Sequence, residues 1–177
     1  GGVDTIYTYS GVDIVIGGTA GDLIDSGTAN GGDTHRDIIL GDSGTANFDH
    51  EGRIDEIFSI DTDIGGDDTI TTGGGDNIVI GGTASDTIDT AADNDIVIGD
   101  SGHATFNSDL DLEAGTLDDA NKIGALRTIE TTSPDIGDVD TINTYNGVDI
   151  VIGGTAGDLI DSGTVESGDT HRDIILG

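Results

Sequence analysis

The stretch that decides the fold is residues 81–99, which read GGTASDTIDTAADNDIVIG. Two of its aspartates, Asp86 and Asp95, stand nine residues apart, and each precedes a branched apolar residue by two positions. The spacing extends upstream, so that the polar members are Asp68, Asn77, Asp86 and Asp95 and the apolar members are Ile70, Val79, Ile88 and Val97. A nine-residue unit with a glycine-rich turn, one carboxylate and one inward apolar side chain is typical of half a coil in a parallel β-solenoid. Carboxylates stacked along the edge of such a solenoid favour a hard cation.

The composition also indicates a fold that depends on metal. The chain has 177 residues, a formal net charge of −31, and only 33% apolar and 3% aromatic residues, which taken alone indicates disorder. The strict period indicates order instead, and bound cations that neutralise the acidic residues reconcile the two. We therefore expect the chain to be disordered without calcium and ordered with it. Calcium is favoured over magnesium because glycine-rich turns offer carboxylates and backbone carbonyls in flexible numbers.

Several partners and locations are excluded or favoured by the same composition. Strong acidity argues against nucleic acid, whose phosphates would be repelled. No stretch approaches the roughly 18 apolar residues of a membrane helix, so no membrane insertion is expected. No signal peptide is visible and the chain begins and ends inside a repeat, which we interpret as a segment of a longer protein. The absence of cysteine fits a reducing compartment, or a fold that uses metal in place of disulfides.

A longer repeat contains the short one. Residues 1–41 recur as residues 137–177 with 35 of 41 positions identical, and a weaker copy begins at Gly65. This predicts one continuous solenoid made of block 1–64, block 65–136 with a long inserted loop at 107–125, and a partial block 137–177. Each complete block holds six candidate nonads, and the last two centre on Phe48 and Ile57 in block one and on Phe106 and Ile129 in block two.

Two nonads per coil place odd nonads in one sheet and even nonads in the other. Parallel strands about 4.8 Å apart then give roughly eight coils, close to 40 Å in length. The inserted loop contains the one helix-compatible stretch, Asp118 to Arg127.

Gly17 to Asp25, which reads GGTAGDLID, and Gly81 to Asp89 resemble the nonapeptide of the repeats-in-toxin (hemolysin-type) calcium-binding family, written G-G-x-G-x-D-x-U-x with U large and apolar. The resemblance extends over nearly the whole chain, except the loop 107–125 and the wide turns. It implies an all-β, right-handed parallel β-roll with calcium-bound turns at both edges, in a large extracellular bacterial repeat protein. It also implies that each turn's aspartate binds calcium together with backbone carbonyls of its own turn and of the turn one coil away.

Carried over position by position, the resemblance implies metal ligands along two edges. The first edge would carry Asp4, Asp22, Asp68, Asp86, Asp140 and Asp158, and the second Asp13, Asp37, Asp55, Asn77, Asp95, Asp149 and Asp173. Ala46, Ala104 and Arg127 take slots where the family has aspartate, so calcium is expected to be weak or missing beside them. The alternative is that these aspartates only cap turns and keep an acidic surface soluble.

The outward faces of the two sheets differ, because side chains alternate along a strand. The flanks of odd nonads are largely polar, whereas those of most even nonads are apolar pairs. Stacked on one sheet, these pairs form a stripe made of Ile14, Ile16, Ile38, Leu40, Ile78, Ile80, Ile96, Ile98, Ile150, Ile152, Ile174 and Leu176. An apolar stripe of this length predicts self-association by lateral packing, or cover by other parts of the same chain.

The sequence predicts a structural role and no enzyme. Serine, histidine and aspartate recur with the repeat and give no unique constellation, and His35 and His171 sit in loop insertions. The favoured function is a calcium-binding repeat segment of a secreted or cell-surface bacterial protein, such as an adhesin shaft, spacer or extracellular fibre, that folds on binding calcium. One alternative is the passive calcium-binding region of a secreted toxin, protease or lipase. Another is an interaction module that displays loops 29–34 and 107–125.

Overall fold

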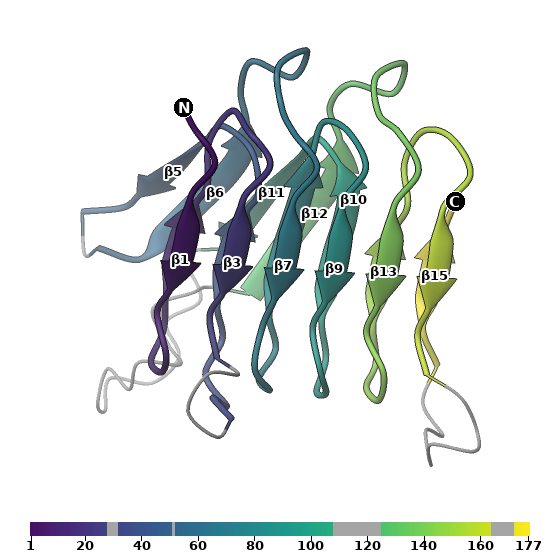
Figure 1. Ribbon diagram of the computed structural model, residues 1–177. Helices are drawn as coiled ribbons and strands as arrows, with labels where there is room; N and C mark the ends of the chain where they lie inside the picture. Colours follow the sequence, from purple (N-terminus) through teal and green to yellow (C-terminus); the bar gives the residue numbers. More distant parts are fainter. Residues whose placement is uncertain (28–31, 51, 108–124, 164–171) are drawn as a thin grey trace.

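The computed structural model describes residues 1–27, 32–50, 52–107, 125–163 and 172–177, and it is built of strands. Two six-stranded parallel sheets carry alternate strands of the chain, and a third, four-stranded antiparallel sheet accompanies them (Figure 1). The order is β1-β3-β7-β9-β13-β15 in the first sheet and β2-β4-β8-β10-β14-β16 in the second. This alternation confirms the predicted all-β, parallel β-roll arrangement.

The strands of the parallel sheets are short, and most contain three residues. The first sheet contains β1 (Thr5–Tyr7), β3 (Leu23–Asp25), β7 (Thr69–Thr71), β9 (Thr87–Asp89), β13 (Thr141–Asn143) and β15 (Leu159–Asp161). The second contains β2 (Ile14–Ile16), β4 (Ile38–Leu40), β8 (Ile78–Gly82), β10 (Ile96–Asp100), β14 (Ile150–Ile152) and β16 (Ile174–Leu176). The antiparallel third sheet contains β5 (Gly44–Phe48), β6 (Ile54–Ser59), β11 (Gly102–Asn107) and β12 (Ala125–Thr131).

Equivalent repeat positions stack directly on one another in both parallel sheets. Ile70 of β7, for example, pairs with Ile24 of β3 on one side and with Ile88 of β9 on the other. The middle residue of each three-residue strand, and the second residue of β8 and of β10, points inward, and β-branched side chains suit this pleated surface. The interior cluster consists of Val15, Ile24, Ile39, Ile70, Val79, Ile88, Val97, Ile142 and Val151, with Ile6 and Ile160 packed against its ends.

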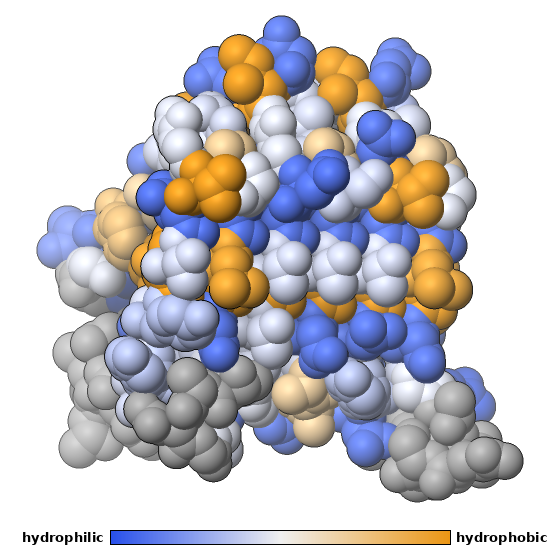
Figure 2. All heavy atoms as spheres, viewed as in Figure 1, coloured by the Kyte–Doolittle hydropathy of each residue, from blue (hydrophilic) through white to orange (hydrophobic). Residues whose placement is uncertain are grey.

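The outward face of the first sheet is mainly polar, as predicted. Figure 2 is viewed onto this sheet and shows hydrophilic and neutral side chains along its strands, with few apolar interruptions. Leu23 and Leu159 are the apolar residues on this face, and they are 39% and 64% exposed.

The prediction of eight coils is wrong, because the last two nonads of each complete block leave the roll. The segments around Phe48 and Ile57 form the hairpin β5–β6, and those around Phe106 and Ile129 form the pair β11–β12. The two pairs are joined through β6 and β11. In the roll, an aspartate carboxylate accepts the backbone N–H of the neighbouring coil; Ala46 and Ala104 have no oxygen to do so. All four segments pair in the antiparallel sheet and add no coils to the roll, although the Ile57 segment has Asp55 at the ladder position.

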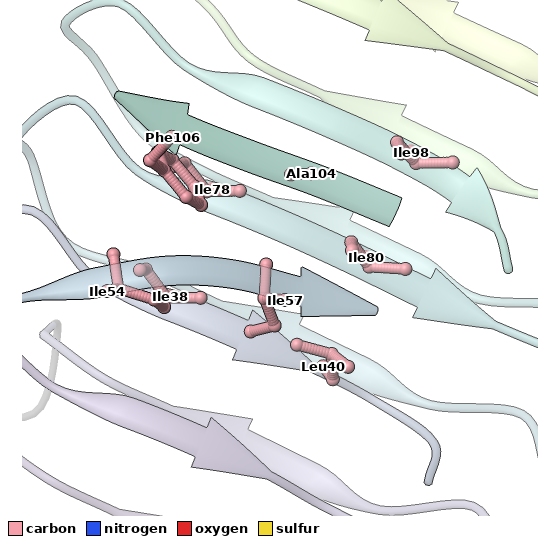
Figure 3. Packing of buried hydrophobic residues seen from close by; sticks show 9 residues of the cluster. All are labelled: Ile38, Leu40, Ile54, Ile57, Ile78, Ile80, Ile98, Ala104 and Phe106. Atoms are coloured by element: carbon pink, nitrogen blue, oxygen red, sulfur yellow. The ribbon is translucent and has the colours of Figure 1, made fainter. Parts of the chain in front are cut away.

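The third sheet covers the centre of the apolar stripe (Figure 3). Its inward residues Ile54, Ile57, Ala104 and Phe106 pack against β4, β8 and β10, and the stripe residues beneath them are at most 1% exposed. Those buried stripe residues are Ile38, Leu40, Ile78, Ile80 and Ile98. Fully burying one such side chain contributes about 1.5–3 kcal/mol. The same chain therefore covers the stripe at its central strands. The prediction of self-association through these five buried residues is wrong.

The two ends of the stripe remain accessible. Ile14 and Ile16 of β2 are 39% and 38% exposed, and Ile174 and Leu176 of β16 are 54% and 55% exposed. Ile96, Ile150 and Ile152 are half-buried. Self-association through the end strands stays a prediction.

Two loop predictions fall mostly outside the described residues. The sequence predicts a helix from Asp118 to Arg127. The last three of these residues belong to strand β12, and the others lie outside the described part of the chain. The insertions at 29–34 and 165–170 are described only at residues 32–34. Within the described part of the chain, no helix has the length and apolar character needed to cross a membrane.

Candidate metal sites

The edge at which the strands of the first sheet begin carries a column of aspartates, which we call the first ladder. It consists of Asp4, Asp22, Asp68, Asp86, Asp140 and Asp158. In each step the carboxylate Oδ1 accepts the backbone N–H of the ladder aspartate in the neighbouring coil, at 2.7 to 3.1 Å. The four central carboxylates are at most 3% exposed. The regular nine-residue turn thus stacks these acidic groups inside the protein, one per coil.

The second carboxylate oxygen of the first ladder has no hydrogen-bond partner. This holds for Oδ2 of Asp22, Asp68, Asp86 and Asp140, all of them buried atoms. Each of these oxygens lies against a glycine: a Cβ added to Gly81 would stand 2.5 Å from Asp86 Oδ2 and would also collide with the carbonyl oxygen of Gly99. A carboxylate oxygen and a carbonyl oxygen converge there, with no donor between them. Oxygens of these two kinds are the ligands that calcium takes in proteins, so the residues fit the predicted ion.

The edge at which the second sheet begins carries a second ladder, made of Asp13, Asp37, Asn77, Asp95, Asp149 and Asp173. The backbone N–H bonds repeat here at 2.9 to 3.1 Å. The second carboxylate oxygen differs from that of the first ladder, because in three coils it accepts a hydrogen bond from a hydroxyl group. These bonds run from Ser26 to Asp37 at 2.6 Å, from Thr144 to Asp149 at 2.7 Å and from Ser162 to Asp173 at 2.7 Å.

The remaining members of the second ladder vary this arrangement. Asn77 donates its amide to Thr72 Oγ1 at 2.9 Å and to the carbonyl of Gly73 at 3.0 Å. At Asp13 and Asp95 the Oδ2 atom has no hydrogen-bond partner. Each of these two aspartates follows, by five positions, a threonine whose hydroxyl is also buried without a partner.

Burial raises the pKa of the ladder carboxyl groups, because the charged form loses its hydration. Within the first ladder it raises the pKa of Asp86 to about 9 and the pKa values of Asp68 and Asp140 to about 7, and neighbouring carboxylates add to the shift. Within the second ladder burial raises the pKa of Asp95 to about 8 and that of Asp37 to about 6. Ionised ladders therefore need positive charge beside them. The arginine ion pairs Arg36–Asp76 and Arg53–Asp49 involve no ladder carboxylate.

A third acidic group lies where the six-residue insertion meets the second ladder. Carboxylate oxygens of Asp13, Asp33 and Asp37 all lie within 4.8 Å of one another. Burial raises the pKa of Asp33, but hydrogen bonds from the side chain and backbone of His35 outweigh it, so the pKa is lowered on balance. Asp33 therefore stays ionised in this cluster. Sequence reasoning missed it, because it stands in an insertion outside the nine-residue spacing.

Two further buried aspartates, Asp42 and Asp100, follow the glycine at the ends of β4 and β10. Asp42 accepts the backbone N–H groups of Gly66 at 3.1 Å and Thr83 at 2.5 Å. Asp100 accepts that of Thr155, and its Oδ1 has no hydrogen-bond partner. Burial raises the pKa of both, that of Asp42 to about 6. The signal that marks them is Gly-Asp where the other described coils read Gly-Gly.

The predicted ligands thus fall into distinct groups. Asp4 is exposed and Asp13, Asp158 and Asp173 are half-buried near the ends of the roll, whereas the central members are buried. Asp55 lies exposed in β6 of the antiparallel sheet and belongs to neither ladder, which corrects its predicted place at the second edge. Comparison of the chain with known protein families, curated proteins and solved structures gives no match.

Proposed function

We propose that this chain is a structural, calcium-stiffened β-roll segment of a secreted or cell-surface bacterial protein, such as a shaft, spacer or extracellular fibre. One observation carries the proposal: columns of buried carboxylates whose second oxygens have no protein donor, at Asp22, Asp68, Asp86 and Asp140. The resemblance to the repeats-in-toxin nonapeptide supports calcium as the ion. The proposed role is non-catalytic.

Calcium would act by cross-linking successive coils. Each central carboxylate of the first ladder already accepts a backbone N–H from one neighbouring coil, and its free oxygen lies near a backbone carbonyl of another. A divalent ion at this place cancels the repulsion between stacked carboxylates and binds the folded chain in preference to the unfolded chain. Extracellular modules bind calcium in the range of about 10⁻⁴ to 10⁻³ M, far above cytosolic concentrations. Folding is therefore proposed to follow export.

A shaft or spacer is favoured over a catalytic role by the uniformity of the coils. Turns with a ladder aspartate or asparagine recur along both edges, and long blocks recur with few changes, as in the 35 of 41 positions shared by residues 1–41 and 137–177. In repeat proteins each unit contacts its neighbours, so that adding blocks adds length without a new fold. The exposed ends of the apolar stripe offer a surface for lateral packing of such shafts.

Circular dichroism with calorimetric calcium titration tests the proposal. The chelated chain at neutral pH should show little β structure, and millimolar calcium should restore it with saturable heat of binding. Magnesium serves as the control ion and should restore less, because it demands near-ideal octahedral geometry. Equal β content in chelator and in calcium, with no heat of binding, would overturn the proposal.

A further inference from the structure

We propose that the two ladders are chemically different: calcium binds along the first ladder, while the second ladder, outside the Asp13–Asp33–Asp37 cluster, stands on hydroxyl hydrogen bonds without a metal. This inference rests on the proposed function and assigns the ion to one edge of the roll. It separates two edges that the repeat pattern treats as equal.

The first argument is the residue that faces the second carboxylate oxygen. On the first ladder this residue is always glycine: Gly17, Gly41, Gly81, Gly99 and Gly153 lie against the Oδ2 atoms of Asp22, Asp68, Asp86, Asp140 and Asp158. On the second ladder the equivalent position, the first of each nonad, always carries a hydroxyl: Thr8, Ser26, Thr72, Thr90, Thr144 and Ser162. The alternation holds in every coil.

The second argument is the balance of donors and acceptors. Beside the first ladder, the free Oδ2 of an ionised carboxylate lies near backbone carbonyls, which are also acceptors, so a cation suits this place and a further acceptor does not. Its central carboxylates are at least 97% buried, so water cannot readily take that place. Beside the second ladder, hydroxyl donors reach Oδ2 of Asp37, Asp149 and Asp173 at 2.6 to 2.7 Å. Those oxygens are satisfied by the protein itself.

The third argument is Asn77, which occupies one rung of the second ladder. Its oxygen accepts the backbone N–H of Asp37, and its amide nitrogen donates to Thr72 and to a backbone carbonyl. An amide N–H aimed at those acceptors leaves no room for a cation at this rung. The second ladder thus includes a neutral member, fully hydrogen-bonded, whereas every first-ladder rung is an aspartate.

The decisive experiment compares Asp68→Asn on the first ladder with Asp149→Asn on the second, in the full chain. Both side chains are at most 1% exposed, and both accept a backbone N–H from the preceding coil, at 2.7 Å for Asp68 and 2.9 Å for Asp149. The readout is the calorimetric number of calcium ions bound by the folded chain. We expect Asp68→Asn to bind fewer calcium ions than the wild type, because a charged ligand is removed. Asp149→Asn should keep the wild-type number of bound ions, because the hydroxyl of Thr144 already satisfies the second oxygen of Asp149.

Asp158→Asn and Asp173→Asn repeat the comparison at the half-buried end of the roll, where loss of one ligand leaves the central column intact. Equal loss of calcium from both ladders overturns the inference and leaves the proposed function standing. A wild-type chain that binds no calcium overturns the proposed function itself. Loss confined to Asp149→Asn and Asp173→Asn would also refute the inference, since it would assign the ions to the opposite edge.

Discussion

Replacing Asp86 by asparagine should stabilise the chelated chain at neutral pH. Burial raises the pKa of Asp86 to about 9, from an ordinary value of 3.8, and the carboxylates of Asp68 and Asp140 add to the shift. The asparagine oxygen can keep the backbone N–H bond from Asp68, which is 2.8 Å long. Its amide would face the carbonyl of Gly99, much as Asn77 donates to a carbonyl on the other ladder.

The magnitude follows from the proton that the folded chain must take up. Between pH 3.8 and about 9 the folded state binds more protons at Asp86 than the unfolded state does, so apo stability falls as pH rises through this window. At pH 7, protonating a group whose unfolded pKa is 3.8 costs about 4 kcal/mol, at 1.36 kcal/mol per pH unit. Asp86→Asn removes this cost, whereas acid below pH 3.8 removes it for the wild type.

Far-UV circular dichroism of the chelated chain, titrated from pH 9 to pH 4, measures the effect. The wild type should gain β structure as the pH falls, and Asp86→Asn should gain it at higher pH. In millimolar calcium the order should reverse, because the variant has lost a ligand. Asp55→Asn is the matched control, since Asp55 is exposed on β6 and should leave both curves unchanged. An Asp86→Asn curve that coincides with the wild type in chelator, or lies at lower pH, would refute the reasoning.

Three substitutions test the packing in calcium, each by urea unfolding. Gly81→Ala should destabilise by about 3 kcal/mol or more, because its Cβ would stand within 2.5 Å of a ladder carboxylate oxygen, whereas Gly157→Ala, with open space around it, should change stability by less than about 0.5 kcal/mol. Ile57→Ala should cost about 2–5 kcal/mol and expose the stripe to hydrophobic dyes, while the 53% exposed Ile64 should tolerate alanine; similar losses at both would contradict the assignment of the cover. Ala156→Gly should stabilise by about 0.5–1 kcal/mol, since Ala156 has a φ of 78°, and a loss of stability would show that this strain is absent.

The nine-residue period predicted the roll well because it is local chemistry repeated. Each turn needs its own glycine and aspartate, and each three-residue strand contributes one inward Ile or Val, such as Ile24 or Val97. Consecutive units of this kind stack in register, so the sequence of the units is enough to predict the arrangement of the parallel strands. The aspartates that the structure brings together at each edge follow from that register, with Asp55 as the exception.

The antiparallel sheet could not be predicted from the period, because the period specifies the parallel stacking of equivalent repeats and not antiparallel pairs. β6 of block one pairs with β11 of block two, and the two strands hold different positions in their blocks and differ in sequence. Two signals were nevertheless present. Ala46 and Ala104 lack the ladder carboxylate, and the apolar stripe on the second sheet required a cover from somewhere. What the stripe did not specify was whether the cover comes from the same chain or another one.

The difference between the ladders could have been found from the sequence, at the position that starts each nonad. Glycine and hydroxyl residues alternate there in step with the two sheets, as in Gly81 followed by Thr90. The repeats-in-toxin nonapeptide has glycine at this position. Threonine and serine there count only as weak matches to it, and the alternation is then overlooked. The structure gives them a physical meaning, since the hydroxyl donates where the glycine leaves an oxygen unpaired.

The next position of the nonad, the second, explains how the chain leaves the roll and returns to it. After β4 and β10 the turn reads Gly-Asp, and there the chain departs into the antiparallel sheet. Asp42 binds the backbone of Gly66, where the chain returns, and that of Thr83 in the next coil, so one carboxylate holds both sides of the excursion. Such a clamp keeps the two parallel sheets in phase although many residues intervene. Glycine at this position would leave those N–H groups without their acceptor. The aspartate therefore holds the roll together at the point where the antiparallel sheet is inserted.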